Sequence, residues 1–373
     1  MKRFLLCLFA FVLVALPALA QDGYQTPPEA LAKLVDAPNT PSVSLSPDRS
    51  HLLLMHQPSL PAIAELAEPE LRLAGLRINP RNNGPSRSRS YNALTLRTLD
   101  GDEREVTGLP DQPRIRNVEW SPDGQHFAFT VDEEDRIDLY VAAVADAQAR
   151  KLMDFPINDA SYGDPFYWLS DSQTILARTV PASHASMRAP EPPRAPSGPI
   201  IQENLGKTAP ARTYQDLLEN EHDEAVFAYY MDTQLVRVNV DGETVPIGEP
   251  ALYTSAAPSP DGQFILAETI HEPFSYLVPA YRFPQRIEVL DMDAQPVKLI
   301  ADLPLQEEVP TAFGSVPTGV RSVNWRADEP AMLYWTEAQD GGDARAEAEN
   351  RDRFFMRAPR LSRTSRRPSP RCP

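Results

Sequence analysis

Apolar and polar positions alternate in a phrase that recurs along the chain. In VEWSPDGQHFAFT (residues 118–130), an apolar strand end leads into Ser121-Pro122-Asp123-Gly124, and a second apolar stretch follows. Pro at the second turn position presets φ, Asp accepts hydrogen bonds from the backbone that bends around it, and Gly leaves the turn without strain. The phrase therefore predicts a strand, a type I turn and a strand.

Five copies of this phrase each begin a larger repeat. The others are VSLSPDRSHLLLM (43–55), FYWLSDSQTILAR (166–178), AAPSPDGQFILAET (256–269) and the degraded VNWRADEPAMLYW (323–335). The earlier copies are followed by a second alternating hairpin, with turn residues such as Asp100-Gly101 and Asp241-Gly242. A four-stranded antiparallel unit repeated at tens of residues predicts an all-β fold, a β-propeller of four-stranded blades with about four to five blades present. The turn aspartates are unevenly spaced because loops of different length intervene: Asp48, Asp123, Asp171, Asp261 and Asp328.

Three insertions interrupt a predicted propeller that spans residues 43–337, between a lead-in (21–42) and a tail (338–373). They cover residues 57–90, 181–223 and 271–286. The first opens with a short helical stretch over 59–67. The second begins Pro-rich and ends in a helix predicted from Thr213, with Asp216 in a capping-box position. Long loops on a rigid β scaffold commonly carry binding, so we expect the functional surface here.

The first 20 residues have the pattern of a secretory signal. Lys2-Arg3 precede an apolar run over 4–16, and Ala18-Leu19-Ala20 form a small-residue cleavage site. The apolar run is shorter than the roughly 18 residues that a membrane span needs. We therefore expect a periplasmic or secreted protein that begins at Gln21 and has no membrane partner after cleavage. Only Cys372 would remain, so no disulfide framework is expected.

The formal net charge of −16 conceals an uneven distribution. Without Lys2, Arg3 and the six arginines between Arg357 and Arg371, the body carries −24. Such a body repels phosphate backbones, which argues against a nucleic-acid partner. The sequence contains no G-x-x-x-x-G-K-[ST], G-x-G-x-x-G, C-x-x-C or H-E-x-x-H motif, so we expect neither a cofactor nor a metal.

The residues provide no catalytic machinery of their own. No G-x-S-x-G is present, which is the motif that lifts a serine nucleophile on a strained turn. The six histidines are scattered, and His51 and His126 fall in strands after turns, where a partly buried structural role is expected. The carboxylate pairs Glu133-Glu134 and Glu307-Glu308 are interpreted as solvated turn residues rather than acid–base pairs.

The third insertion offers the best candidate for substrate contact. His271, Tyr276, Arg282 and Arg286 place donors beside an aromatic and apolar surface, where they could receive a substrate carboxylate. The alternative is that Arg282 and Arg286 pair with the acidic surface of their own protein. The sequence leaves this choice open.

The chain resembles a known group of proteins. Its S-P-D-G repeats are similar to those of exported TolB-like propellers and of the propeller that precedes the hydrolase domain in prolyl oligopeptidase-family serine peptidases. Four longer segments resemble the glutamyl endopeptidase branch of that family: residues 58–87, 213–230, 268–291 and 323–343. This resemblance implies a peptide substrate and a Ser-Asp-His triad in a C-terminal α/β-hydrolase domain, whose mouth is covered by a propeller that is usually seven-bladed and filters substrates by size.

No position here matches the triad motifs of that family, and the sequence reaches about its fifth blade. We interpret it as the propeller portion of such a peptidase, truncated before the catalytic domain and inactive alone. The alternatives are a stand-alone TolB-like propeller that binds envelope proteins or peptides, and a remnant without function. From Arg357 the tail has six arginines, four prolines and no carboxylate. It is read either as a disordered end or as the product of a shifted reading frame near Met356.

An incomplete ring also leaves its first and last blade faces without a neighbour. We expect Trp325, Leu333 and Trp335 to belong to such a face, and the product to be poorly soluble.

Overall fold

A computed structural model describes residues 27–185, 187–193, 214–309 and 313–358. The predicted signal segment and the arginine-rich end of the tail lie outside these residues. The chain divides into two compact units at Asn39. In the first, helix α2 (Glu29–Val35) carries an ion pair between Lys33 and Glu29, with Nζ and Oε1 2.8 Å apart. The second unit holds everything from Thr40 onward.

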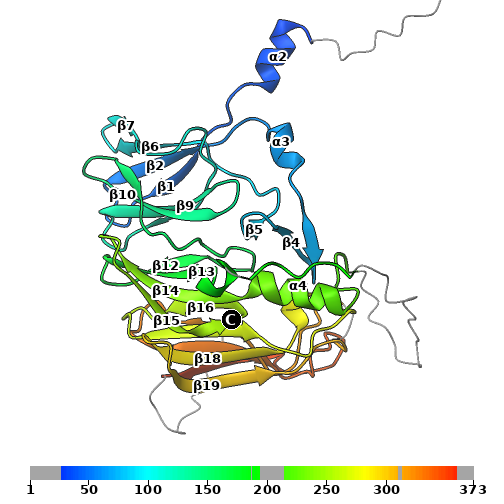
Figure 1. Ribbon diagram of the computed structural model, residues 1–373. Helices are drawn as coiled ribbons and strands as arrows, with labels where there is room; N and C mark the ends of the chain where they lie inside the picture. The colour runs from blue at the N-terminus through cyan, green and yellow to red at the C-terminus, as the bar shows by residue number, and fades with distance from the viewer. Residues whose placement is uncertain (1–26, 186, 194–213, 310–312, 359–373) are drawn as a thin grey trace, which may run out of the picture. The chain divides into compact units, whose positions relative to one another are not determined.

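The second unit is all-β and consists of antiparallel sheets that follow one another as propeller blades (Figure 1). Blade 1 contains β1 (Ser42–Leu45), β2 (His51–His56), β6 (Ala93–Thr98) and β7 (Glu103–Glu105). Blade 2 contains β8 (Ile115–Trp120), β9 (His126–Asp132), β10 (Ile137–Ala143) and β11 (Ala149–Lys151). Blade 3 contains β12 (Phe166–Trp168), β13 (Thr174–Thr179), β14 (Thr233–Asn239) and β15 (Thr244–Ala251). Blade 4 contains β16 (Tyr253–Pro258), β17 (Phe264–Ile270), β18 (Gln285–Asp291) and β19 (Pro296–Leu303).

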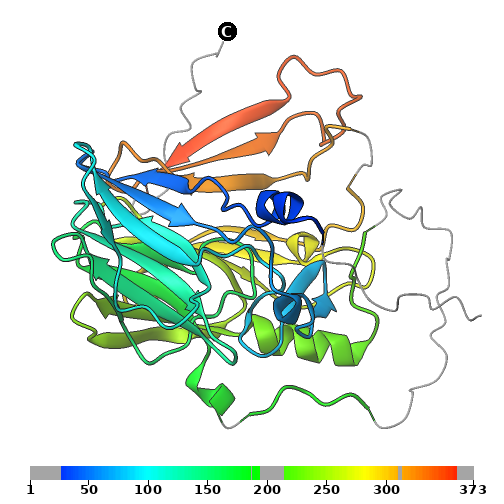
Figure 2. The same cartoon turned by 90° about the horizontal axis from the view of Figure 1, so that it is seen from above.

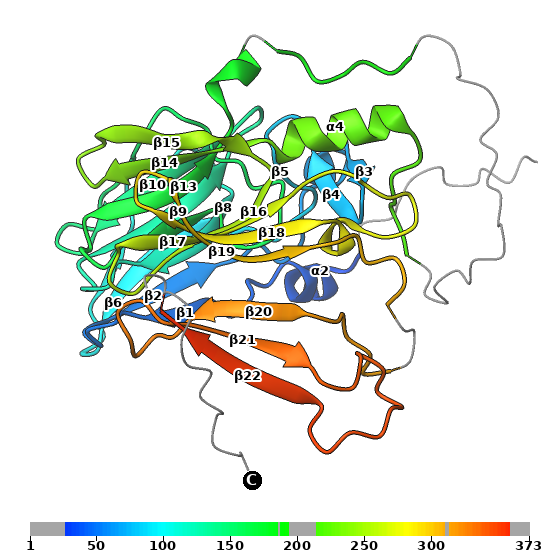
Figure 3. The ribbon, with the colours of Figure 1, turned by 90° about the horizontal axis from the view of Figure 1, so that it is seen from below.

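Blade 5 has three strands in the described residues, β20 (Val320–Trp325), β21 (Leu333–Ala338) and β22 (Asp352–Arg357). Strand β22 pairs with β21 in full register, from Leu333 opposite Arg357 to Ala338 opposite Asp352 (Figure 3). The sheet therefore continues beyond residue 337, the predicted end of the propeller. The alternating segment DRFFMR forms the strand that pairs with the free edge of β21.

The predicted turns form as the sequence indicates. In blade 2, the Gly124 amide donates to the Ser121 carbonyl at 2.9 Å, and the Ser121 hydroxyl donates to Asp123 Oδ1 at 2.7 Å. The same hydroxyl–carboxylate bond recurs at 2.6 Å between Ser46 and Asp48 and at 2.6 Å between Ser259 and Asp261. Gly124 has φ +70°, and a Cβ there would lie 3.0 Å from Asp48 Oδ1 of the preceding blade. This turn therefore requires glycine for its conformation and for the close approach of two blades.

Four apolar cores join consecutive blades. They lie between blades 1 and 2, 2 and 3, 3 and 4, and 4 and 5. Phe129, fully buried between blades 1 and 2, stacks on Tyr140 with ring centroids 5.8 Å apart. In each case alternate strand residues face one neighbour and the intervening residues face the other, as period-2 patterning requires.

Tryptophan side chains link the first strands of neighbouring blades. The indole Nε1 of Trp120 donates to Ser44 Oγ at 3.0 Å, that of Trp168 to the Glu119 carbonyl at 3.2 Å, and that of Trp325 to the Ala257 carbonyl at 3.0 Å. Each tryptophan stands three residues before its turn aspartate, and each acceptor stands four residues before the turn aspartate of the preceding blade. The tryptophan of the repeated phrase is thus an inter-blade contact.

Trp325 and Leu333 do not lie on an open face, contrary to the sequence-based expectation. Leu333 is fully buried against blade 4, and Trp325 and Trp335 pack on the same core. The exposed apolar side chains belong to the opposite faces: Phe354 and Met356 on β22, and Val43 and Leu45 on β1, are 40–57% exposed. The assignment failed because the turn phrase places its tryptophan toward the preceding blade.

The three insertions all connect the second strand of a blade to its third. They join β2 to β6, β13 to β14 and β17 to β18, so antiparallel pairing brings them out at the same end of the blades. The first holds α3 (Ile63–Leu66) and a small sheet of β3 (Leu71–Leu73), β4 (Leu76–Asn79) and β5 (Gly84–Pro85). The second holds the 3₁₀ turn η1 (Ala182–Ala185) and α4 (Glu221–Met231), and the third holds η2 (Ala280–Arg282).

Candidate functional site

The three insertions share one hydrophobic core, which we call the insertion cluster. Ile78 of β4, Phe227 and Met231 of α4, and Ala280 and Phe283 of the third insertion are all fully buried in it. Figures 2 and 3 show α4 lying against the small sheet of the first insertion. Segments some 200 residues apart in the sequence therefore build a single surface on the propeller.

Helix α4 is positioned by its start. The side chain of Asn220 caps it by accepting a hydrogen bond from the Asp223 amide at 3.0 Å, and Glu221, Asp223 and Glu224 place negative charge in its first turn. The helix predicted from Thr213 therefore begins eight residues later. Asp216, expected in a capping box, has φ +58° and accepts a hydrogen bond from Arg77 Nε at 2.8 Å. Its carboxylate serves the first insertion instead of a helix start.

Three phenylalanines join α4 to the third insertion. Phe227 meets Phe274 and Phe283 edge to face, with ring centroids 5.2 Å and 5.6 Å apart, while Phe274 and Phe283 stack at 5.4 Å. Edge-to-face pairs of this kind contribute about 0.5–1.5 kcal/mol each beyond burial. The third insertion is thereby held rigidly against α4.

Three of the four predicted substrate-contact residues are engaged by the protein's own groups. His271 Nε2 lies 3.1 Å from Asp302 Oδ1, and its Nδ1 lies 2.7 Å from the Glu272 carbonyl. Arg286 Nε lies 3.2 Å from Glu288 Oε2. A hydrogen bond to Glu224 and the charges at the start of α4 raise the pKa of Tyr276 to about 12. Arg286 therefore pairs with a carboxylate of its own protein, which is the alternative that the sequence left open.

The fourth residue, Arg282, differs. Its side chain is buried in η2, with 6% of the residue exposed, and no acceptor of a described residue lies within hydrogen-bonding distance of its Nε and Nη1. The guanidinium carbon lies 5.7 Å from the ring centroid of Tyr281. The four predicted residues thus share one segment without converging on one point, and the sequence offered no means of telling the buried arginine from the exposed one.

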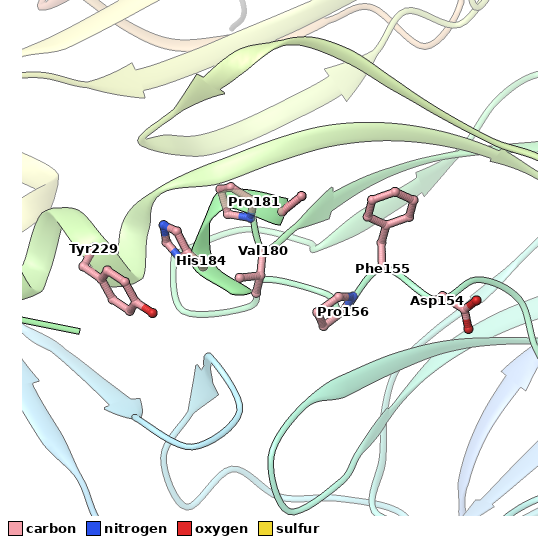
Figure 4. Close-up of a pocket in the computed structure, with 8 residues that line it drawn as sticks. Asp154, Phe155, Pro156, Val180, Pro181, His184 and Tyr229 are labelled. Carbon is pink, nitrogen blue, oxygen red and sulfur yellow. The ribbon is translucent and has the colours of Figure 1, made fainter. Parts of the chain in front are cut away.

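A pocket of about 380 Å³ lies where the second insertion begins, directly after β13 (Figure 4). The sequence did not predict it. Phe155, Pro156, Val180 and Pro181 form its apolar wall. His184 stacks on Tyr229 of α4 at 4.2 Å between centroids, and its Nε2 lies 3.2 Å from Asp232 Oδ2. In sequence His184 was one of six scattered histidines, because its partners come from residues more than 40 positions away.

The geometry shows no catalytic constellation in the described residues. The His184–Asp232 pair has the form of a base and its orienting acid, but the described residues that line the pocket include no serine, threonine or cysteine that it would activate. His51 and His126 are partly buried in β2 and β9, as expected of structural residues. Within the described ranges, no group of three His, Cys, Asp or Glu side chains is arranged to hold a metal ion. None of the helices formed there has the length and apolar character to cross a bilayer.

Two buried arginines bond to the segment that connects blade 2 to blade 3. Arg116 of β8 donates from Nε to Asp132 and from Nη1 to Asp159, both at 2.8 Å. Although burial lowers it, these two carboxylates raise the pKa of Arg116 above its usual range. Arg178 of β13 donates to the carbonyls of Tyr162, Gly163 and Thr254 at 3.0–3.1 Å. The terminal nitrogens of these two buried arginines therefore have acceptors within the protein.

Comparisons with known proteins identify homologues. No protein-family model matches the chain. The chain is 42% identical over 350 residues to "Probable glutamyl endopeptidase, chloroplastic" from Oryza sativa subsp. japonica, covering 90% of this chain and 37% of the relative. The protein of the same description from Arabidopsis thaliana is also 42% identical over 350 residues, with 90% and 36% covered. Among solved structures, the Pyrococcus horikoshii acylaminoacyl peptidase aligns with a TM-score of 0.40 at 10% identity, over 87% of this chain and 38% of that one.

The β-propeller described above is therefore homologous to proteins described as probable glutamyl endopeptidases, and the chain spans about 37% of their length.

Proposed function

We propose that this chain is the N-terminal, substrate-gating β-propeller portion of an exported serine peptidase of the prolyl oligopeptidase family, close to the glutamyl endopeptidases. In this proposal the Ser-Asp-His triad belongs to an α/β-hydrolase domain outside this sequence. The chain alone binds peptide without cleaving it.

The observation that carries the proposal is the 42% identity over 90% of the chain. It is supported by the insertion cluster, since three of the four segments that resemble glutamyl endopeptidases in sequence (58–87, 213–230 and 268–291) pack together in it at one end of the blades. A peptide that approaches this end meets exposed aromatic side chains, including Tyr276 and Tyr281, on a rigid β scaffold.

The test compares two polypeptides. The first is the present chain. The second continues into the downstream DNA, read in the frame that extends the alternating pattern after Met356. We expect the purified chain to leave a glutamyl-anilide peptide intact and to take no label from a serine-directed fluorophosphonate. The extended polypeptide should complete further blades, present G-x-S-x-G, and gain both activities.

Hydrolysis by the short chain that is sensitive to the fluorophosphonate would contradict its inactivity. Stop codons in every downstream frame would contradict the truncation and favour a self-sufficient binding propeller. Export is tested separately, by sequencing the N-terminus of the mature protein, which should begin at Gln21.

A further inference from the structure

The turn between β4 and β5 contains a chemically labile dipeptide. Asn83-Gly84 is the one asparagine–glycine pair in the sequence. Asparagine is a thermolabile residue, and a following glycine has no side chain to keep its amide nitrogen away from the asparagine side chain. In this dipeptide the Gly84 nitrogen can therefore attack Cγ of Asn83 once the backbone is free to bring the two atoms together.

The fold restrains the dipeptide on both sides. The Gly84 amide donates to Asn82 Oδ1 at 3.0 Å, so its proton is engaged. The Asn83 amide donates to the Asn79 carbonyl at 3.2 Å, and the Asn83 carbonyl accepts from the Asp159 amide at 2.9 Å. Asn83 is held at φ +58°, a conformation that asparagine tolerates better than most residues. These bonds have to break before the Gly84 nitrogen loses its proton and reaches Cγ.

The turn is also packed into the protein. Gly84 is buried, and a Cβ there would lie 2.6 Å from Ile137 Cδ1 of β10 in blade 2. The neighbouring Pro85 pairs with Ile78 of β4, which is fully buried in the insertion cluster together with Phe227. A base in solvent therefore reaches Gly84 only when the first insertion lifts from blade 2, and the insertion cluster opposes that movement.

The side chain of Asn83 is held less well than its backbone. Its Nδ2 is buried, and no acceptor of a described residue lies within hydrogen-bonding distance. Replacing this amide by a carboxylate would put a charge at an atom that is shielded from water, which is unfavourable. An isoaspartyl linkage would also lengthen the backbone by a methylene and take the carbonyl that Asp159 binds out of the backbone. Either product should keep the turn from closing as before.

We propose that Asn83 is a site of spontaneous deamidation whose rate is set by opening of the insertion cluster. The Gly84 nitrogen gives its proton to a base in solvent and forms a bond to Asn83 Cγ. The bond from Cγ to Nδ2 breaks, and Nδ2 leaves as ammonia with a proton from water. The resulting succinimide takes up water at either carbonyl and becomes aspartate or isoaspartate. This inference is independent of the peptidase proposal.

The experiment follows the conversion in the purified chain at pH 8, at a temperature well below its melting transition. Samples are taken over days and digested with pepsin at acidic pH. Mass spectrometry then quantifies the asparaginyl, aspartyl and isoaspartyl forms of the peptide that contains Asn83. A parallel sample is kept unfolded in urea. We expect the unfolded chain to convert at least about tenfold faster than the folded chain, because reaction in the folded chain requires prior opening.

Two matched variants show which opening controls the rate. Phe227→Ala should accelerate conversion in the folded chain by about tenfold or more, because it removes a fully buried side chain of the insertion cluster. Leu333→Ala is the control, since it removes a fully buried side chain from the core between blades 4 and 5 and should leave the rate unchanged. If Phe227→Ala does not fold, Phe227→Leu gives the same comparison with a smaller expected acceleration.

Three further variants test the turn itself. Asn82→Ala removes the acceptor of the Gly84 amide and should also accelerate conversion. Asn83→Gly suits the positive φ, and it should abolish the modification while keeping the melting temperature of the wild type. Asn83→Asp has the side chain of one product, and it should lower the melting temperature because it buries a charge.

Equal rates in the folded and unfolded chains, or no conversion in either, would overturn the proposal. A Phe227→Ala chain that converts no faster than the wild type would do the same, as would a Leu333→Ala chain that converts as fast as Phe227→Ala. An Asn83→Asp chain that melts with the wild type would show that the aspartyl product does not disturb the turn.

Discussion

Replacing Phe227 by alanine tests whether the insertion cluster is a real core. Phe227 is fully buried and meets two phenylalanines of the third insertion edge to face. Removing a buried aromatic ring costs about 3–5 kcal/mol. Because the insertion cluster is separate from the four inter-blade cores, this cost should fall first on the local opening of α4 and the third insertion rather than on the blades.

Amide hydrogen exchange measured by mass spectrometry reads that opening directly. A loss of about 3–5 kcal/mol corresponds to exchange that is faster by roughly two to three and a half orders of magnitude in α4 and residues 274–283. Phe227→Leu keeps much of the apolar volume and should accelerate exchange far less. Phe129→Ala, in the core between blades 1 and 2, is the contrasting control and should act on β2 and β9. If Phe227→Ala left exchange in α4 within about threefold of the wild type, the insertions would not share a core.

Three other changes follow from contacts in the propeller. Trp120→Phe should lower the free energy of unfolding by about 1 kcal/mol in urea denaturation, because the hydrogen bond from its indole to Ser44 of the preceding blade is lost. Trp335→Phe is the control, because the indole of Trp335 bonds Glu337 within the same blade. Hydrogen bonds from Ser46 and Ser50 lower the pKa of Asp48 from 3.8 to about 2, so charged Asp48 stabilises its turn above pH 4 and this stability is lost as the pH falls toward 2. The Asp48→Asn variant should lose no stability from this group on acidification, and an acid unfolding profile identical to that of the wild type would contradict the prediction. Phe354→Lys and Met356→Lys should reduce aggregation in ultracentrifugation without lowering the melting temperature, whereas Leu333→Lys replaces a fully buried side chain and should unfold blade 5. If the first two variants aggregate as much as the wild type, the exposed face of β22 does not cause the aggregation.

The blades were predictable because their determinants are local. Ser121, Asp123 and Gly124, which form the turn, lie within four consecutive residues, so the local sequence is enough to predict it. The side of the blade to which Trp325 points was not predictable from the local sequence. The alternation in a strand shows which residues share a face but not which neighbouring blade that face contacts.

The candidate site depended on longer-range facts. The start of α4 was misplaced because both Thr213 and Asn220 begin plausible helical segments, and the choice is made by the capping bond to Asp223 and by burial of Phe227. Arg282 and Arg286 are four residues apart and look equivalent in the sequence. Arg282 is buried next to Phe283 of the insertion cluster, whereas Arg286 pairs with Glu288 on its own strand. Only the folded chain reveals this difference.

The shared core of the insertions also sets an order for folding during synthesis. Leu73 and Ile78 emerge from the ribosome about 200 residues before Phe283, which is needed to cover them. At about 5–20 residues per second, the small sheet of the first insertion waits roughly 10–40 s for its partners. Blades 1 to 3 can pair strand by strand over that interval, yet the apolar side chains above them stay open to solvent or to a chaperone. The nascent chain is therefore most vulnerable to aggregation before its fourth blade is complete.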